Sequence, residues 1–176
     1  LYQPLTVIRT GTDAIASGED LNSVYEGTFK GLRKLSKSMN VDIKTMGKNF
    51  DAIAKNIATF GAMTNEEMLK LSATMTKTGV SMTSLQGVAD KFDNFDTATE
   101  SVAKLSQAFG VQLDAMELMN AQDPMERVGI IQKAFKARGK SLQDMSRAER
   151  KYFAASTGLS LEDLNATFGE NAVAVD

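Results

Sequence analysis

Five short segments of this chain share one pattern: Gly or Asn, any residue, a capping type such as Ser or Asp, an aliphatic residue, two more residues, then Met or Leu. The instances begin at Asn40, Gly79, Gly110, Gly139 and Gly158. Gly and Asn can adopt the left-handed conformation that ends a helix, and the capping side chain can accept a hydrogen bond from a free N–H of the next helix. Each instance therefore predicts that one helix ends and another begins almost at once.

The five instances are unevenly spaced, with 39, 31, 29 and 19 residues between successive starts. A solenoid such as a tetratricopeptide array keeps a nearly constant period, with matching bulky positions in every unit. The spacing therefore favours a string of related helical hairpins over a regular repeat array.

Further helix starts are marked by capping boxes, in which a hydroxyl and a carboxylate satisfy backbone N–H groups reciprocally. We predict such boxes at Thr64–Glu67, Thr97–Glu100 and Ser146–Glu149, and a helix start at Asp123, which precedes a proline. No stretch has the sustained alternation and β-branched enrichment of a strand. The chain is predicted to be all-α, with about eight to ten helices of ordinary length.

Apolar residues from Leu21 to Phe60 recur at helical spacing, and we call them the apolar seam. From Ile43 onward the steps are three, four, three, four and three residues, the heptad spacing of a coiled coil. We expect the seam to be an assembly surface between copies of the chain, so that Ile53→Asp or Ile57→Asp disrupts assembly or folding through an unpaired buried charge. Its members are Leu21, Tyr25, Leu32, Leu35, Met39, Ile43, Met46, Phe50, Ile53, Ile57 and Phe60.

Two arrangements of residues 21–60 remain open. The steps through Leu35, Met39, Ile43 and Met46 suit an eleven-residue repeat that one continuous rod can accommodate. The pattern at Asn40 instead predicts a helical hairpin. The predicted organisation is an irregular or frayed segment over 1–20, an amphipathic rod or hairpin with coiled-coil spacing over 21–60, and a compact cluster of short capped helices over 61–176.

The composition argues against most catalytic chemistry, since the chain of 176 residues contains no histidine and no cysteine. The commonest general base, the commonest transition-metal ligand and the thiolate nucleophile are therefore missing. We expect no enzyme activity, no cofactor, no metal and no small-molecule substrate. No uncharged apolar run approaches the roughly 20 residues that span a bilayer, and no signal peptide is recognisable.

Two charged clusters invite binding hypotheses. The acidic segment 90–96 offers carboxylates but lacks the spacing, central glycine and terminal glutamate of a calcium loop, so an interhelical turn anchored in the core by Phe92 and Phe95 is favoured. Lysines and arginines crowd residues 30–55, yet the chain carries a net charge of −2 and lacks interleaved aromatics that stack on bases. Nucleic-acid binding is therefore disfavoured.

Over roughly residues 40–170 the chain resembles the tail tape measure proteins of bacteriophages. The resemblance lies in the Met-, Ala- and Leu-rich helical faces and in turns of the kind found at 78–81, 108–111 and 157–164. It implies a structural virion protein whose helical chain lies inside the tail tube, sets tail length and engages the baseplate hub or tail tip. Because the chain begins with Leu1 and not Met, we expect it to be a processed product or the ordered part of something longer.

The sequence thus predicts a structural component of a phage tail, located in the virion, with itself and tail tube or baseplate hub proteins as partners. The alternative is a helical adaptor or scaffold domain that binds partner helices, in a phage or in the cytoplasm. A nucleic-acid-binding regulator ranks third.

Overall fold

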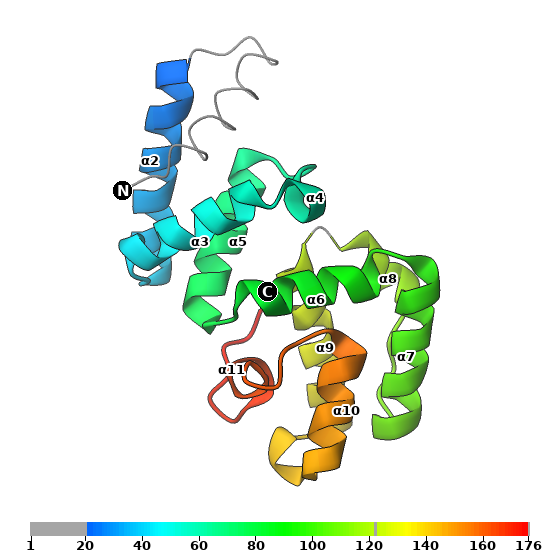
Figure 1. Cartoon of the computed structure of the whole chain (residues 1–176). Helices are drawn as coiled ribbons and strands as arrows, with labels where there is room; N and C mark the ends of the chain where they lie inside the picture. Colours follow the sequence, from blue (N-terminus) through cyan, green and yellow to red (C-terminus); the bar gives the residue numbers. More distant parts are fainter. Residues whose placement is uncertain (1–20, 122, 176) are drawn as a thin grey trace. The chain divides into compact units, whose positions relative to one another are not determined.

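The chain is all-α in the part that the structure describes. This computed structural model describes the backbone of residues 21–121 and 123–175, and the side chains of residues 26–121 and 123–175. Ten α-helices and one 3-10 helix occupy these residues (Figure 1). The predicted irregular segment 1–20 lies outside them. None of the described helices is both long and apolar enough to cross a membrane.

The contacts of the chain form two compact units, residues 1–77 and 78–176. The first unit contains α2 (Leu21–Met39), α3 (Ile43–Lys55), α4 (Ile57–Phe60) and α5 (Asn65–Thr78), the last ending at the boundary. The second contains α6 (Met82–Phe92), α7 (Phe95–Phe109), α8 (Ala115–Asn120), α9 (Pro124–Arg138), the 3-10 helix η1 (Leu142–Asp144), α10 (Arg147–Thr157) and α11 (Leu164–Phe168).

Helices α2 and α3 are separate elements, so residues 21–60 do not form one continuous rod. Asn40 has a φ of 53° and lies between them. The N–H of Val41 returns to the carbonyl of Ser36 (3.0 Å), and the Asp42 side chain accepts a hydrogen bond from the N–H of Thr45 (2.8 Å). These are the helix end and helix start that the pattern predicts, and α3 leaves in a different direction from α2 (Figure 1).

Helix α5 packs with α2 and α3 inside the first unit. The Asn49 amide in α3 donates a hydrogen bond to the Thr76 hydroxyl in α5 (2.9 Å), and the Asn65 amide in α5 donates to the Thr28 hydroxyl in α2 (3.1 Å). The expected grouping placed α5 in the later region, 61–176. Side-chain contacts between distant residues, which a local pattern does not contain, join it to the earlier helices.

All five residues that open the sequence pattern adopt the left-handed conformation. Their φ values are 53° at Asn40, 76° at Gly79, 68° at Gly110, 70° at Gly139 and 85° at Gly158. Within the described residues they are also the whole set with positive φ. Each follows directly on the last residue of a helix, so the predicted helix ends are confirmed.

The predicted helix starts are less uniform. Asp42 and Ser81 cap α-helices, and Ser141 caps the short 3-10 helix η1. After Gly110 the cap is Asp114 and not Gln112, and after Gly158 a further turn delays α11 until Leu164. A carboxylate accepts a hydrogen bond from a backbone N–H more strongly than an amide does. This difference explains why Asp114, and not Gln112, caps α8.

Three of the four additional helix starts are confirmed. The boxes beginning at Thr64 and Ser146 are complete, and Asp123 caps α9 ahead of its proline. The box predicted at Thr97 is wrong, because α7 already begins at Phe95 and the Asn94 side chain accepts the hydrogen bond from the N–H of Asp96. Asn is among the strongest N-cap residues, so the helix starts after Asn94 and not at Thr97.

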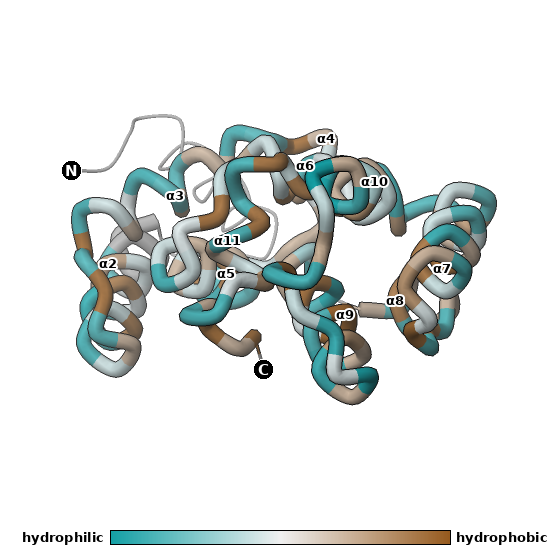
Figure 2. Tube along the Cα trace, turned by 90° about the horizontal axis from the view of Figure 1, so that it is seen from below, coloured by the Kyte–Doolittle hydropathy of each residue, from teal (hydrophilic) through white to brown (hydrophobic). Residues whose placement is uncertain are grey.

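The core of the second unit is built around phenylalanines from four helices. The ring centroids of Phe153 in α10 lie 4.7 Å from Phe135 in α9, 4.8 Å from Phe168 in α11 and 5.5 Å from Phe109 in α7. These rings meet edge to face, the arrangement that aromatic quadrupoles favour. Figure 2 shows hydrophilic and hydrophobic residues alternating along helices such as α7, as expected for elements with one buried face.

The turn opened by Gly79, together with the start of α6 that follows it, meets the turn opened by Gly158 in the second unit. We call this contact the turn junction. A Cβ added at Gly158 would collide with the backbone carbonyl of Gly87, and one added at Gly87 would collide with that of Gly158. The close approach therefore requires glycine on both sides.

One carboxylate holds the turn junction together. Asp163 Oδ2 accepts hydrogen bonds from the N–H of Ser81 (3.0 Å), the Ser81 hydroxyl (2.7 Å) and the Ser84 hydroxyl (2.5 Å). The Ser84 oxygen in turn accepts from the N–H of Ser160 (2.9 Å). Burial alone would raise the pKa of Asp163, but the hydrogen bonds from Ser84 and Ser81 outweigh it and hold the pKa below its ordinary value.

Candidate functional sites: the apolar seam and an arginine-lined pocket

The middle of the apolar seam is internal to the folded chain. Leu32, Met46, Phe50, Ile53 and Phe60 are each at most 2% exposed. Their heptad spacing comes from the inward face of α3 and its neighbours, a stripe that serves equally well as a core. These side chains are therefore not free to form an external surface in this fold.

The remaining members of the seam divide into three groups. Ile43 and Ile57 are 42% and 62% exposed, at the first positions of α3 and α4. Leu35 and Met39 in α2 are partly exposed. Leu21 and Tyr25 lie outside the residues whose side chains are described. Assembly of copies through the seam stays a prediction. Among the members whose side chains are described, its accessible part consists of the two exposed isoleucines and the partly exposed edge of α2.

The acidic segment 90–96 forms the turn between α6 and α7. Asp93 pairs with Arg127 of α9 (2.6 Å), whose Nε donates to the carbonyl of Leu118 at 2.9 Å. Phe92 is fully buried, as expected, whereas Phe95 is 56% exposed and does not anchor the turn. Phe95 opens α7, and at that position its side chain faces outward. Across the described residues, no group of three or more acidic side chains is placed to hold a metal ion.

The basic side chains of α2 and α3 are exposed to solvent. Lys30, Arg33, Lys34 and Lys37 lie on α2, and no ion pair is found for them among the described residues. On α3, Lys55 pairs with Asp51 four residues earlier (2.7 Å). Such exposed charges are the ordinary composition of a solvated helix face.

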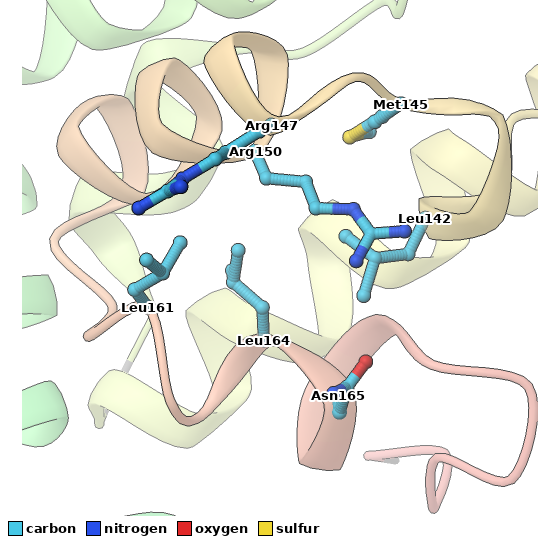
Figure 3. Close-up of a pocket in the computed structure, with 7 residues that line it drawn as sticks. All are labelled: Leu142, Met145, Arg147, Arg150, Leu161, Leu164 and Asn165. Atoms are coloured by element: carbon cyan, nitrogen blue, oxygen red, sulfur yellow. The ribbon is translucent and has the colours of Figure 1, made fainter.

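A pocket that the sequence reading missed opens in the second unit, between η1, α10 and α11. Its volume is about 460 Å³, within the range of small-ligand and side-chain pockets. We call it the arginine pocket, and Figure 3 shows its lining: Leu142, Met145, Arg147, Arg150, Leu161, Leu164 and Asn165. The two arginines come from α10, and the last three residues approach from the segment that enters α11.

The apolar part of this lining comes from two copies of the sequence pattern. Leu142 and Met145 are the aliphatic and Met positions of the fourth instance, and Leu161 and Leu164 are the matching positions of the fifth. The turn junction fixes the second pair, because Asp163 lies between them and bonds to Ser81 and Ser84. The recurrence of the pattern was the available signal, but only the fold brings the two instances together.

The arginines of the pocket lack partners in the described part of the chain. No ion pair joins Arg147, which is exposed, or Arg150, which is half-buried, to a described residue, and the buried Nε of Arg150 has no hydrogen-bond partner among those residues. The first turn of α10 contains one acid, Glu149, whose carboxylate is occupied by the N–H of Ser146 (3.3 Å) in the capping box. A buried donor without an acceptor is unusual in a folded protein.

Comparisons with protein-family models, with curated proteins and with solved structures returned no match to this chain.

Proposed function

We propose that this chain is a structural component of a bacteriophage tail, part of a tape measure protein that sets tail length and contacts the baseplate hub or tail tip. The observation that carries the proposal is the conformation of the five pattern turns. Because all five opening residues are left-handed, the turns that resemble those of tape measure proteins are features of the folded chain and not accidents of composition.

The proposed partners are further copies of the chain and the tube or hub proteins of the tail, which would place it in the virion. Ile43 and Ile57 are the apolar seam members most accessible for such contacts. Exposed aliphatic side chains next to a folded core are suited to helix-to-helix association, although two of them give only a small contact area.

Assembly can be tested with the purified chain by light scattering over a wide concentration range. We expect an oligomer that Ile57→Asp weakens, because the substitution puts a charge into an apolar contact. Ala58→Asp is the matched control, since it adds the same charge at the next exposed position of the same short helix. A chain that stays monomeric at high concentration would overturn assembly through the seam.

The tail assignment needs a separate test in the phage that encodes the chain. Mass spectrometry of purified tails should detect its peptides, and deleting helices from it should shorten the tails. Tails that contain none of the chain, or whose length is independent of it, would exclude a tape measure role.

The arginine pocket favours a second candidate, a helical adaptor that binds a partner protein, because an unpaired cationic pocket suits recognition more than tail-length measurement. Co-purification with tail tube or hub proteins supports the tail proposal, whereas a specific partner outside the tail supports the adaptor. DNA affinity that falls steeply with salt would instead favour the third reading, a nucleic-acid-binding regulator.

A further inference from the structure

We propose that the arginine pocket binds a peptide carboxylate flanked by aliphatic side chains, supplied by a partner protein. The inference goes beyond the tail assignment and does not depend on it, since it rests on the pocket alone. The structure contributes three observations: two arginines without an ion pair to a described residue, a buried donor without an acceptor among those residues, and an apolar floor.

The charge of the pocket selects an anion. Arg147 and Arg150 line it, no acidic residue does, and neither guanidinium is neutralised by an ion pair with a described residue. The buried Nε of Arg150 has no acceptor among the described residues, so a carboxylate that reached it would satisfy a donor that these residues leave unpaired. Guanidinium and carboxylate groups match in plane and spacing, and their hydrogen bonds are among the strongest in proteins.

The apolar floor of the pocket favours a ligand that carries an aliphatic side chain next to the anionic group. Leu142, Met145 and Leu164 are at most 8% exposed but still line the cavity, and Leu161 at its rim is 45% exposed. An inorganic anion would leave this apolar surface in contact with water, whereas an acidic residue next to Leu or Ile would cover it. Asn165 adds an amide that can bond to the peptide backbone at the edge.

The size of the pocket limits the occupant to a short segment. A volume of about 460 Å³ accommodates a few side chains and not a whole helix. Figure 3 shows the two arginine side chains pointing to different sides of the pocket. The occupant is therefore a short acidic and aliphatic stretch, in which one carboxylate meets Arg150 and one or two aliphatic side chains enter the cavity.

The test is an NMR titration of the uniformly ¹⁵N-labelled chain with the blocked peptide acetyl-Leu-Glu-Leu-amide. We expect saturable shifts at the backbone amides of Leu142 and Leu161, and a downfield shift of the Arg150 Nε–H resonance as it gains an acceptor. The matched probe acetyl-Leu-Gln-Leu-amide keeps the shape and removes the charge, and we expect its Kd to be at least about tenfold higher.

Variants separate the pocket from the general charge of α10. Arg150→Met keeps an unbranched apolar stem but removes the guanidinium, and it should raise the Kd for the Glu peptide about tenfold or more; Arg147→Gln should also weaken binding. Lys151→Gln is the control, because it removes one exposed positive charge from the same helix but does not line the pocket. Arg150→Met should melt no lower than the parent chain, since it removes an unsatisfied donor.

Three outcomes would overturn the proposal. Equal affinity for the Glu and Gln peptides would show that the arginines do not recognise the carboxylate. Binding that Lys151→Gln weakens as much as Arg150→Met does would reduce the effect to net charge. Displacement of the peptide by an equimolar amount of inorganic phosphate would show a simple anion site without a role for the leucines.

Discussion

The two units use the same short turn in different ways. In the first unit the turn at Asn40 is a local device, closed by hydrogen bonds within residues 36–45. In the second unit the turns opened by Gly79 and Gly158 meet in the turn junction, where the Asp163 carboxylate of the later turn accepts hydrogen bonds from Ser81 and Ser84 of the earlier one. The same pattern therefore only connects two helices in the first unit, whereas in the second unit it also makes a tertiary contact.

This difference predicts where each unit is vulnerable. The first unit depends on the buried part of the apolar seam, and its turn should tolerate change. The second unit depends on its turns as well as its aromatic core, so substitutions at a turn should approach the effect of substitutions in a core. The following predictions test that contrast.

The largest effect is expected for Ile53→Asp in the first unit. Ile53 is fully buried, so the substitution places an unpaired carboxylate in an apolar core and should destabilise the unit by about 4 kcal/mol or more. Urea denaturation followed by circular dichroism provides the measurement. At concentrations low enough for the chain to be monomeric, Ile57→Asp, at a 62% exposed position, should leave the unfolding midpoint nearly unchanged. Equal losses from both variants would contradict the division of the seam into core and surface.

Gly158→Ala should destabilise the second unit by about 3 kcal/mol or more, because a left-handed conformation and a backbone collision with Gly87 both oppose the added methyl group. Gly139→Ala is the matched control. Gly139 is also left-handed, but a Cβ there meets open space, so only the conformational strain of about 1–2 kcal/mol applies. Chemical denaturation of the two variants should separate the conformational strain from the collision with Gly87. Similar losses of stability in both variants would argue against the close approach at the junction.

Asp163→Ala should destabilise the second unit by about 2 kcal/mol, because Ser81 and Ser84 lose a charged acceptor. The folded-state pKa of Asp163 is lowered, so its contribution is complete above the unfolded pKa of about 4 and disappears as the pH falls through the lower folded value. Stability measured from pH 6 to pH 2 should therefore decline less steeply in the variant. An unchanged pH profile would mean that the carboxylate is not held as described.

The smallest effect is expected for Asn40→Gly in the first unit, which should raise stability by up to about 1 kcal/mol. Glycine adopts the left-handed conformation of Asn40 without the Cβ contact, and the exposed Asn40 side chain makes no hydrogen bond with a described residue. Thermal melting is the simplest measurement. A marked loss of stability would show that this turn also takes part in a tertiary contact, and would remove the contrast between the units.

Much of the local structure was predictable because it depends on neighbouring residues. A left-handed Gly or Asn, and a side chain that caps the next helix, act on residues within one or two helical turns. The predicted helix ends were therefore correct at all five instances of the pattern. The errors at Thr97 and Gln112 arose where two nearby residues competed for one cap, and Asn94 and Asp114 had the stronger acceptors. Competition of this kind involves small energy differences that a pattern does not rank.

The candidate sites were less predictable because they depend on burial and on distant neighbours. The heptad spacing identified Ile53 and Ile57 equally as members of the seam, although one is fully buried and the other is exposed. The arginine pocket combines Leu142 and Leu161, which belong to separate instances of the pattern. The spacing of apolar residues along one helix contains neither the difference in burial between Ile53 and Ile57 nor the contact between the two segments that line the pocket.

The sequence by itself determined that this chain is a succession of capped helices and where most of them end, since backbone conformation at Gly and Asn and hydrogen bonding at caps are local effects. The tertiary structure decided which turns meet, which face of the seam is core and where two arginines line a pocket. These outcomes depend on the approach of segments far apart in the chain, such as Gly87 to Gly158, and on the burial that the approach produces.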